Sequence, residues 1–167
     1  PVSGTAAPNR EITVTFGNTA LKTKTDSKGK WSVTLPPMPP CATGQTLAAV
    51  QNGDSAKLED VLVGEVWLAS GQSNMLFRLN QTTTAKEDIA ASGDDQLRLL
   101  NNVPQAHTNN APYSAKDFDA VTTDNFYKGQ WAASSPATSG PMTAVGYYFG
   151  KKLREGLGIP VGIIHSS

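Results

Sequence analysis

The sequence has 167 residues, of which 38% are hydrophobic and 17% charged, a composition typical of a folded globular protein rather than a disordered or fibrous one. Fourteen basic residues balance fourteen acidic ones, so no net charge attracts the chain to nucleic acid or to an anionic membrane surface. No apolar run approaches the roughly 18–20 residues that cross a bilayer, and residues 1–10 lack the charged-then-apolar order of a signal peptide. We therefore expect neither nucleic acid nor a membrane as a partner, and the missing signal does not indicate a compartment.

Residues 1–60 have the pattern of a small β-sandwich module. Glu11–Phe16 alternates apolar residues with threonines, and 31–35 repeats that alternation, as expected for half-buried strands. Leu47–Val50 and 57–62 are candidates for further strands. Glycine-rich turn signals separate the first two strands, which favours antiparallel pairing.

Cys41 is the single cysteine of the chain. An internal disulfide and a cysteine-based zinc cluster are therefore excluded. We interpret Cys41 as a loop thiol or as the partner of a cysteine outside this chain.

The pattern changes at residue 61, and 61–167 reads as an α/β domain. The nearly continuous apolar run 61–69 predicts a strand buried on both faces. Thr84 and Glu87 have the spacing of a capping box, with Thr84 as N-cap of a helix ending near Gly93. Residues 97–103 predict a short strand, and the polar stretch 104–131 has no clear period and is expected to be a surface excursion.

An amphipathic helix is predicted from Met142 onward, because Val145, Phe149 and Leu153 recur at steps of three and four. Glycines at 156 and 158 end it, and 161–164 predicts a second buried strand. Strand and helix thus alternate from residue 61, which is the order of a parallel sheet. Ser167 follows a buried strand at the carboxyl edge, where such sheets bind ligands, and the sheet has an uncovered edge; we expect more polypeptide to follow, in the same chain or a separate one.

Ser73 is the candidate nucleophile, because it follows a strand and opens a helix. The amides of Ser73 and Asn74 would lack intrahelical acceptors there, so they are candidate donors to the oxyanion of an acyl-transfer intermediate. Gln72 and Asn74 flank the hydroxyl with polar side chains and are the candidates for contacts with substrate. The spacing alone favours a serine that only caps a helix, and Met75 stands where the usual nucleophile elbow has glycine.

A serine nucleophile also needs a base, and the chain has two histidines. His107 lies in the polar excursion, where a solvated or structural role is favoured. His165 closes the last strand near Ser73, and hydrogen-bonded support is the favoured role for it.

The stretch VLVGEVWLASGQSNM at 61–75 closely resembles the sialate O-acetylesterase family of SGNH-type carbohydrate esterases, whose first catalytic block reads GQSNM with serine as nucleophile. The segments DSKGKWSVTLPP and 131–167 resemble the preceding β-module and the approach to the second block. The resemblance implies a flavodoxin-like three-layer hydrolase domain, incomplete in this chain, with Ser73 as nucleophile and its amide as one oxyanion donor. It implies no metal and no cofactor, and it transfers no base, because the family's Asp-x-x-His block does not occur here.

The resulting hypothesis is a serine esterase that hydrolyses acetyl esters on carbohydrates, with O-acetylated sialic acids as the first candidate substrates. Acetylxylan or another acetylated polysaccharide is an alternative substrate. A non-catalytic carbohydrate-binding fragment is the alternative from another functional class. By resemblance we expect a secreted, periplasmic or lysosomal protein whose base comes from the C-terminal remainder.

Overall fold

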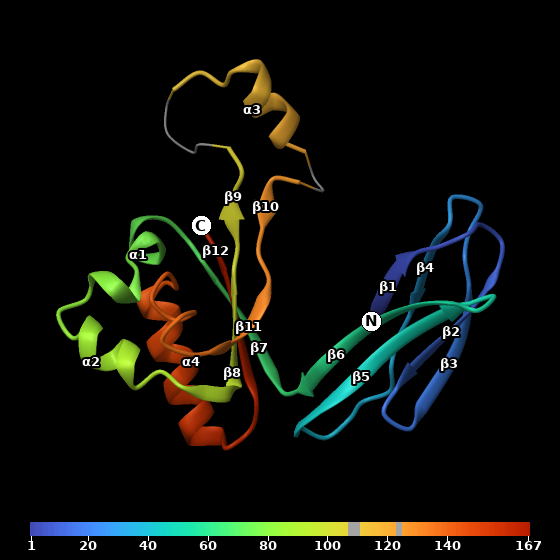
Figure 1. Ribbon diagram of the computed structural model, residues 1–167, viewed down its shortest axis with the longest axis horizontal. Coiled ribbons are helices and arrows are strands. Elements are labelled where there is room, and N and C mark those ends of the chain that lie inside the picture. The colour runs from blue at the N-terminus through green and yellow to red at the C-terminus, as the bar shows by residue number, and fades with distance from the viewer. Residues whose placement is uncertain (107–110, 123–124) are drawn as a thin grey trace. The chain divides into compact units, whose positions relative to one another are not determined.

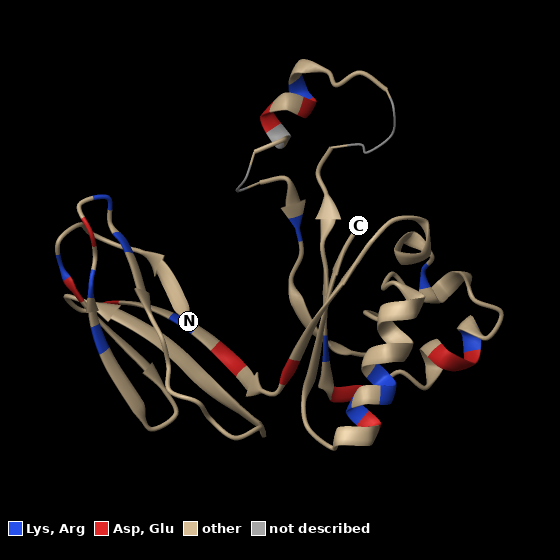
Figure 2. Ribbon diagram, turned by 180° about the vertical axis from the view of Figure 1, so that it is seen from behind, with Lys and Arg blue, Asp and Glu red and all other residues tan. Residues whose placement is uncertain are grey.

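The computed structural model describes residues 1–106, 111–122 and 125–167, and the chain divides into two compact units, Pro1–Val63 and Gly64–Ser167. His107 lies outside the described residues. Figure 1 shows the first unit built of strands and the second of a sheet with helices. Charges of both signs are interspersed on both units (Figure 2), as the balanced composition predicts.

The first unit is an antiparallel β structure. A four-stranded sheet has the order β3-β2-β5-β6, and a two-stranded ribbon pairs β1 with β4. The strands are β1 Val2–Thr5, β2 Glu11–Phe16, β3 Thr19–Lys24, β4 Lys30–Val33, β5 Cys41–Gln51 and β6 Asp54–Val63. The predicted strands at 11–16, 47–50 and 57–62 are confirmed within β2, β5 and β6. The strands β1 and β3 were not predicted, because their half-exposed sequences carry few apolar residues.

Ile12, Val14 and Trp31 form the core of this unit and join the sheet to the ribbon. Trp31 is 9% exposed, and a side chain at Gly4 would meet its ring at 2.8 Å. Cys41 begins β5 with a free thiol that donates to the Thr43 carbonyl, so its predicted loop position is corrected to a strand end.

The second unit is a mixed α/β structure around a four-stranded sheet of order β11-β8-β12-β7. β12 pairs in parallel with both β7 and β8, and β11 is antiparallel to β8. The predicted parallel sheet is therefore confirmed for three strands. The elements are β7 Glu65–Ser70, α1 Ser73–Leu76, a 3₁₀ turn Leu79–Gln81, α2 Ala85–Ala90, β8 Asp94–Asn101, β9 Val103–Pro104, α3 Ala115–Ala120, β10 Tyr127–Lys128, β11 Trp131–Ser134, α4 Ala144–Leu157 and β12 Val161–Ser166.

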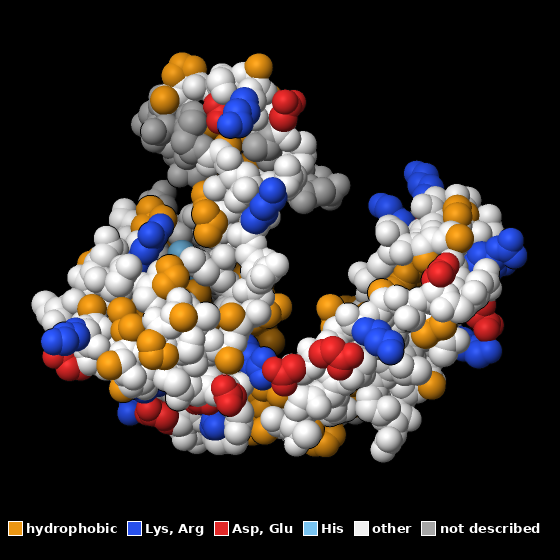
Figure 3. All heavy atoms as spheres, viewed as in Figure 1, with side chains coloured by type: hydrophobic (Ala, Val, Ile, Leu, Met, Phe, Trp, Pro, Cys, Tyr) orange, Lys and Arg blue, Asp and Glu red, His pale blue; other side chains and the backbone are white. Residues whose placement is uncertain are grey.

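The helix α4 packs on one face of this sheet through two glycines. A Cβ on Gly146 would lie 3.0 Å from the Ala69 Cβ, and one on Gly150 would lie 2.5 Å from the Ile163 Cγ1. Ile163 is fully buried there with Leu97 and Tyr147. Figure 1 shows α1 and α2 on the same side of the sheet as α4. Hydrophobic side chains also gather on the surface around α4 (Figure 3). Phe149 of α4 makes an edge-to-face contact with Trp67 of β7.

The predicted continuous strand 61–69, buried on both faces, is wrong. Gly64 separates β6 from β7, with a Cβ position only 2.0 Å from the Pro160 carbonyl oxygen. β7 has one strand neighbour, β12, and Val66 and Leu68 on the face away from α4 are 60% and 66% exposed. The strand is apolar but lies at the edge of the sheet, which periodicity alone does not reveal.

The helix predictions are confirmed in place and corrected in length. α2 begins after Thr84 as expected but ends at Ala90, before Gly93, and the Thr84 hydroxyl bonds the Asp88 carboxylate instead of capping the helix. α4 ends at Leu157 and is followed by Gly158 as C-cap, whose left-handed φ of 67° suits glycine, while Gly156 lies inside the helix.

The polar excursion contains more structure than its sequence predicts. It carries α3, whose Ser114 and Asp117 form a capping box, and the strand β10. β11 directly follows and pairs with β8, so the edge strands of the described sheet are β11 and β7. No helix in the described part of the chain is long and apolar enough to cross a membrane.

Candidate active site

Ser73 lies at the carboxyl edge of the parallel strands, on the turn that leaves β7. Ser70 is the last residue of β7 and pairs with Ser166 of β12, and Gly71 and Gln72 then lead to α1. Gly71 has a φ of 158°, and a Cβ there would lie 3.1 Å from the Met75 side chain. A larger residue at 71 would therefore press on the turn that carries Ser73.

The turn α1 presents Ser73 to solvent. Gln72, Ser73 and Asn74 are all exposed. The amides of Met75 and Leu76 donate to the Gln72 carbonyl at 2.8 and 3.1 Å, which closes the turn. Ser73 and Asn74 are its first two residues, so their amides have no acceptor within the turn.

The turn is fastened to the start of α4. The Phe77 carbonyl accepts from the Ala144 amide at 2.8 Å, and the Thr143 hydroxyl lies 3.6 Å from the Met75 sulfur. Leu79 is fully buried in the core of the unit, directly after the turn. The candidate nucleophile Ser73 is thus an exposed side chain on a segment that is attached to the core through Leu79 and to α4 through Phe77.

His165 pairs in register with Ala69 of β7, near the carboxyl end of the strand that leads to the turn. It is 5% exposed, and its Nδ1 and Nε2 lie 2.6 Å from the Asn101 Oδ1 and 2.8 Å from the Ser167 Oγ. Both ring nitrogens therefore have a hydrogen-bond partner, and the supporting role of His165 stays a prediction. In the part of the chain that the structure describes, the Ser73 hydroxyl has no hydrogen-bond partner.

Asn101 and Ser167 were missed in the sequence. Asn101 ends β8, and it pairs in register with His165 of β12. Polar residues at the carboxyl ends of adjacent parallel strands are the signal that would have found this cluster. No group of three or more metal-ligating side chains occurs among the residues described.

The buried His165 predicts a pH-dependent stability. Burial is the main cause that lowers its pKa, the charge of Arg78 adds to the lowering, and a hydrogen bond with the Met75 backbone opposes it. His165 therefore binds a proton more strongly in the unfolded chain than in the folded one. Its neutral ring stabilises the folded chain fully above the ordinary histidine pKa of about 6.5, and this stabilisation is lost as the pH falls through the lower pKa of the folded state. Urea unfolding should give a smaller free energy at about pH 5.5 than at about pH 7.5.

The matched variant His165→Gln removes the titrating group and should flatten this pH dependence. Asp88, whose pKa is lowered chiefly by its hydrogen bond with Thr84, loses its contribution only below the ordinary carboxyl value, outside this window. Equal slopes for both chains between these pH values would contradict the assignment to His165.

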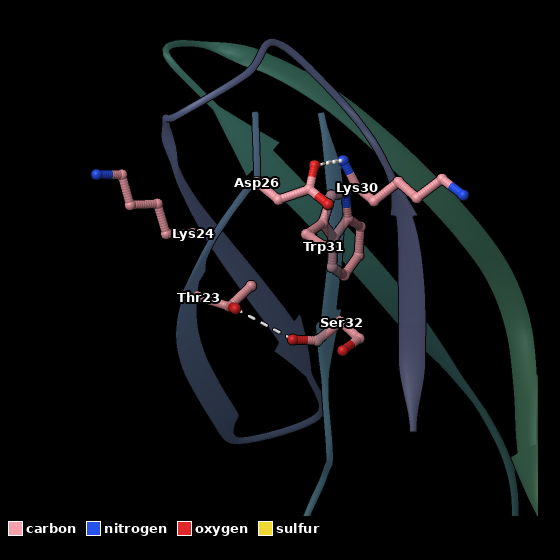
Figure 4. A pocket seen from close by; sticks show the side chains of 6 residues that line it. All are labelled: Thr23, Lys24, Asp26, Lys30, Trp31 and Ser32. Carbon is pink, nitrogen blue, oxygen red and sulfur yellow. Dashed lines mark hydrogen bonds between the residues drawn. The ribbon is translucent and has the colours of Figure 1, made fainter. Parts of the chain in front are cut away.

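A depression lies on the first unit and is lined by Thr23, Lys24, Asp26, Lys30, Trp31 and Ser32 (Figure 4). Several of its polar side chains make hydrogen bonds with nearby backbone groups of the same unit. The Asp26 carboxylate accepts from the Lys28 and Lys30 amides at 2.8 and 2.9 Å, and the Thr23 hydroxyl donates to the Ser32 carbonyl. The Trp31 ring is core, so it offers no open face on which a sugar could stack.

No protein-family model matches the chain. Human sialate O-acetylesterase (Homo sapiens) is 31% identical over 181 residues, which cover 98% of this chain and 32% of the relative. Mouse sialate O-acetylesterase (Mus musculus) is 28% identical over 178 residues, with 98% and 31% covered. The resemblance to sialate O-acetylesterases is confirmed. The chain spans about a third of the length of these relatives.

A solved structure extends the resemblance to the fold. The crystal structure of a carbohydrate acetylesterase from Xanthomonas citri has a TM-score of 0.80 and 34% sequence identity with this chain. The match covers 98% of this chain and 35% of that one. The mixed α/β architecture is therefore that of the corresponding part of a carbohydrate acetylesterase.

Proposed function

We propose that this chain is the N-terminal part of a serine esterase that removes acetyl groups from carbohydrates, with Ser73 as the nucleophile. The observation that carries the proposal is the position of Ser73. Its hydroxyl is exposed on an anchored turn at the carboxyl edge of parallel strands, within a chain similar along 98% of its length to carbohydrate acetylesterases. The two units then correspond to a β-module and to part of an SGNH-type, flavodoxin-like hydrolase domain.

The proposed reaction is acyl transfer in two steps. The Ser73 Oγ attacks the acetyl carbonyl carbon while a base takes its proton, and the Ser73 and Asn74 amides donate to the oxyanion. The tetrahedral intermediate expels the sugar oxygen, which receives the proton and leaves as a sugar hydroxyl. Water then attacks the acetyl-serine, releasing acetate and restoring the serine hydroxyl. Gln72 and Asn74 are exposed beside Ser73 and are proposed to contact the sugar.

The base is proposed to come from polypeptide beyond this chain. His165 is occupied on both ring nitrogens, and the relatives are about three times as long as the chain. A histidine oriented by a carboxylate in that remainder would complete the site. The proposed location is outside the cytoplasm: secreted, periplasmic or lysosomal.

Acetate release from two substrates tests the proposal and its substrate class. The intact protein that carries this chain is expected to release acetate from O-acetylated sialic acid faster than from acetylxylan. A faster release from acetylxylan would instead identify acetylated plant polysaccharides as the substrate class. The similarity to a carbohydrate acetylesterase is compatible with that alternative as well. Inertness toward both would overturn the esterase proposal and favour a carbohydrate-binding fragment.

A further inference from the structure

The sheet of the second unit is covered by helices on one face only. Figure 1 shows α1, α2 and α4 on that face and α3 beyond the ends of the strands. Leu99 and Ile163 belong to the buried core on this side, together with Tyr147 of α4. Because successive side chains of a strand point to opposite faces, their neighbours Leu100 and Ile164 lie on the other face. Among the described residues, that second face has no helix packed on it.

The strand register aligns apolar side chains across this open face. Ile164 of β12 pairs with Leu68 of β7 on one side and with Leu100 of β8 on the other. Leu100 pairs in turn with Trp131 of β11. These four side chains form one line across all four strands, and we name them the apolar row. Its two ends are open, because Leu68 is 66% exposed and Trp131 is 48% exposed.

Gly162 widens the apolar row into a surface. A Cβ on Gly162 would lie 3.1 Å from the Trp131 Cη2 and 3.4 Å from the Val66 Cγ2, so the glycine leaves the space in which the indole ring lies against the sheet. Val66 is exposed on the same face. Arg98, the partner of Gly162 in β8, donates to the Asp95 carbonyl at 2.8 Å, toward the amino end of the strand. The surface is thus apolar near the carboxyl edge of the sheet and charged on the side away from it.

A surface of this kind is expected to be covered in the folded protein. Parallel strands of α/β proteins are buried on both faces, and contiguous exposed apolar patches mark interaction sites. The carbohydrate acetylesterase from Xanthomonas citri matches this chain with a TM-score of 0.80, but the match covers only 35% of that protein. The sialate O-acetylesterases are also about three times as long as this chain. The additional polypeptide of these relatives is long enough to supply a further layer on the sheet.

We propose that the polypeptide following residue 167 packs the apolar side of an amphipathic helix onto the apolar row. The inference rests on the proposed function, in which this chain is the N-terminal part of a longer esterase. The row lies close to the candidate site, since Leu68 stands two residues before Ser70 at the end of β7. Packing on the row would hold the remainder against the sheet beside the edge that carries Ser73, where the missing base is needed.

Thiol labelling of the intact protein tests whether the apolar row is covered. Leu68→Cys places a thiol in the row, and a Cys41→Ser background removes the native thiol of this chain. Leu58→Cys is the matched control, because Leu58 is also a strand leucine, 62% exposed, on β6 of the first unit. The rate constant of maleimide labelling is measured in the folded and in the urea-unfolded protein, and mass spectrometry identifies the labelled peptide.

Leu68→Cys should react at least about 10-fold more slowly in the folded protein than in the unfolded one, because a covered thiol reacts only after local opening. Leu58→Cys should react within about threefold of its unfolded rate constant, because its site needs no opening. Equal rate constants of Leu68→Cys in the two states would overturn the proposal. Equal protection at the two positions would also overturn it, since the row would then have no cover of its own.

A photochemical cross-link identifies what lies on the row. Trp131 is replaced by benzoylphenylalanine, which keeps an aromatic ring at the exposed end of the row. Irradiation of the intact protein should join this residue to peptides that follow residue 167 in the same molecule. Cross-linked dimers would instead identify a second copy as the occupant, and links confined to residues 1–167 would identify this chain itself. Either of these two results would overturn the proposal.

Neither readout depends on the chemistry of Ser73, so the two proposals fail separately. Acetate release together with an unprotected Leu68→Cys would overturn the packing of the remainder on this face and leave the esterase proposal intact. A protected Leu68→Cys in a wild-type background without acetate release would instead remove the proposed activity and support the packing.

Discussion

Replacement of Ser73 by alanine in the intact protein is expected to lower acetate release from acetylated sugars by at least about 1,000-fold, because the covalent path through acetyl-serine is lost. The oxyanion amides and the substrate contacts remain, so a small residual rate over water is expected. The free energy of unfolding should change little, since Ser73 is exposed and its hydroxyl makes no hydrogen bond in the described part of the chain. Acetate release under saturating substrate measures the effect.

Ser70→Ala is the matched control for this change. Ser70 is also an exposed serine at the same edge of the sheet, but it ends β7 and precedes the turn. The control should keep its activity and its fluorophosphonate label, whereas Ser73→Ala should lose both. Activity retained in Ser73→Ala would refute the assignment of the nucleophile, and loss in Ser70→Ala alone would move that role to residue 70.

Replacement of Gly150 by alanine is expected to destabilise the chain by about 1–3 kcal/mol, because the added methyl group overpacks the contact between α4 and β12. The new Cβ would lie 2.5 and 2.8 Å from the Ile163 Cγ1 and Cδ1. Ile163 is fully buried and has no free space into which to move. The free energy of unfolding, from urea titration, measures the effect.

Gly156→Ala is the control on the same helix. A Cβ at Gly156 meets nothing within 4 Å, so alanine adds only its better helix propensity. This variant should be more stable than the wild type by roughly 0.5–1 kcal/mol. Equal effects at both positions would show that helix propensity, rather than close packing against Ile163, controls the two glycines.

Local patterns were sufficient to predict most of the regular structure. The alternation in Glu11–Phe16 and the three- and four-residue steps from Val145 to Leu153 are short-range properties, and β2 and α4 follow from them. The same reasoning failed for residues 61–69, because an apolar strand looks alike in sequence at the centre and at the edge of a sheet. The strand β11 was not predicted, because its four residues are too few to show the alternation of apolar and polar residues that marks a strand.

The candidate site was predicted in part. The sequence context of Ser73 is local, so the residue could be singled out with its neighbours Gln72 and Asn74. The cluster of His165, Asn101 and Ser167 could not be assembled in this way. Asn101 and His165 are 64 positions apart, and only the parallel register of β8 and β12 brings them together.

The sequence by itself determined several of the regular elements, among them β2 and α4, the place of Ser73 after a strand, and the resemblance to carbohydrate acetylesterases. Only the tertiary structure decided that β7 lies at an edge, that α4 approaches the sheet through Gly146 and Gly150, and that His165 faces Asn101 rather than Ser73. The reason is physical: propensity and periodicity act over a few residues, whereas strand order and side-chain contacts depend on which distant segments pack together.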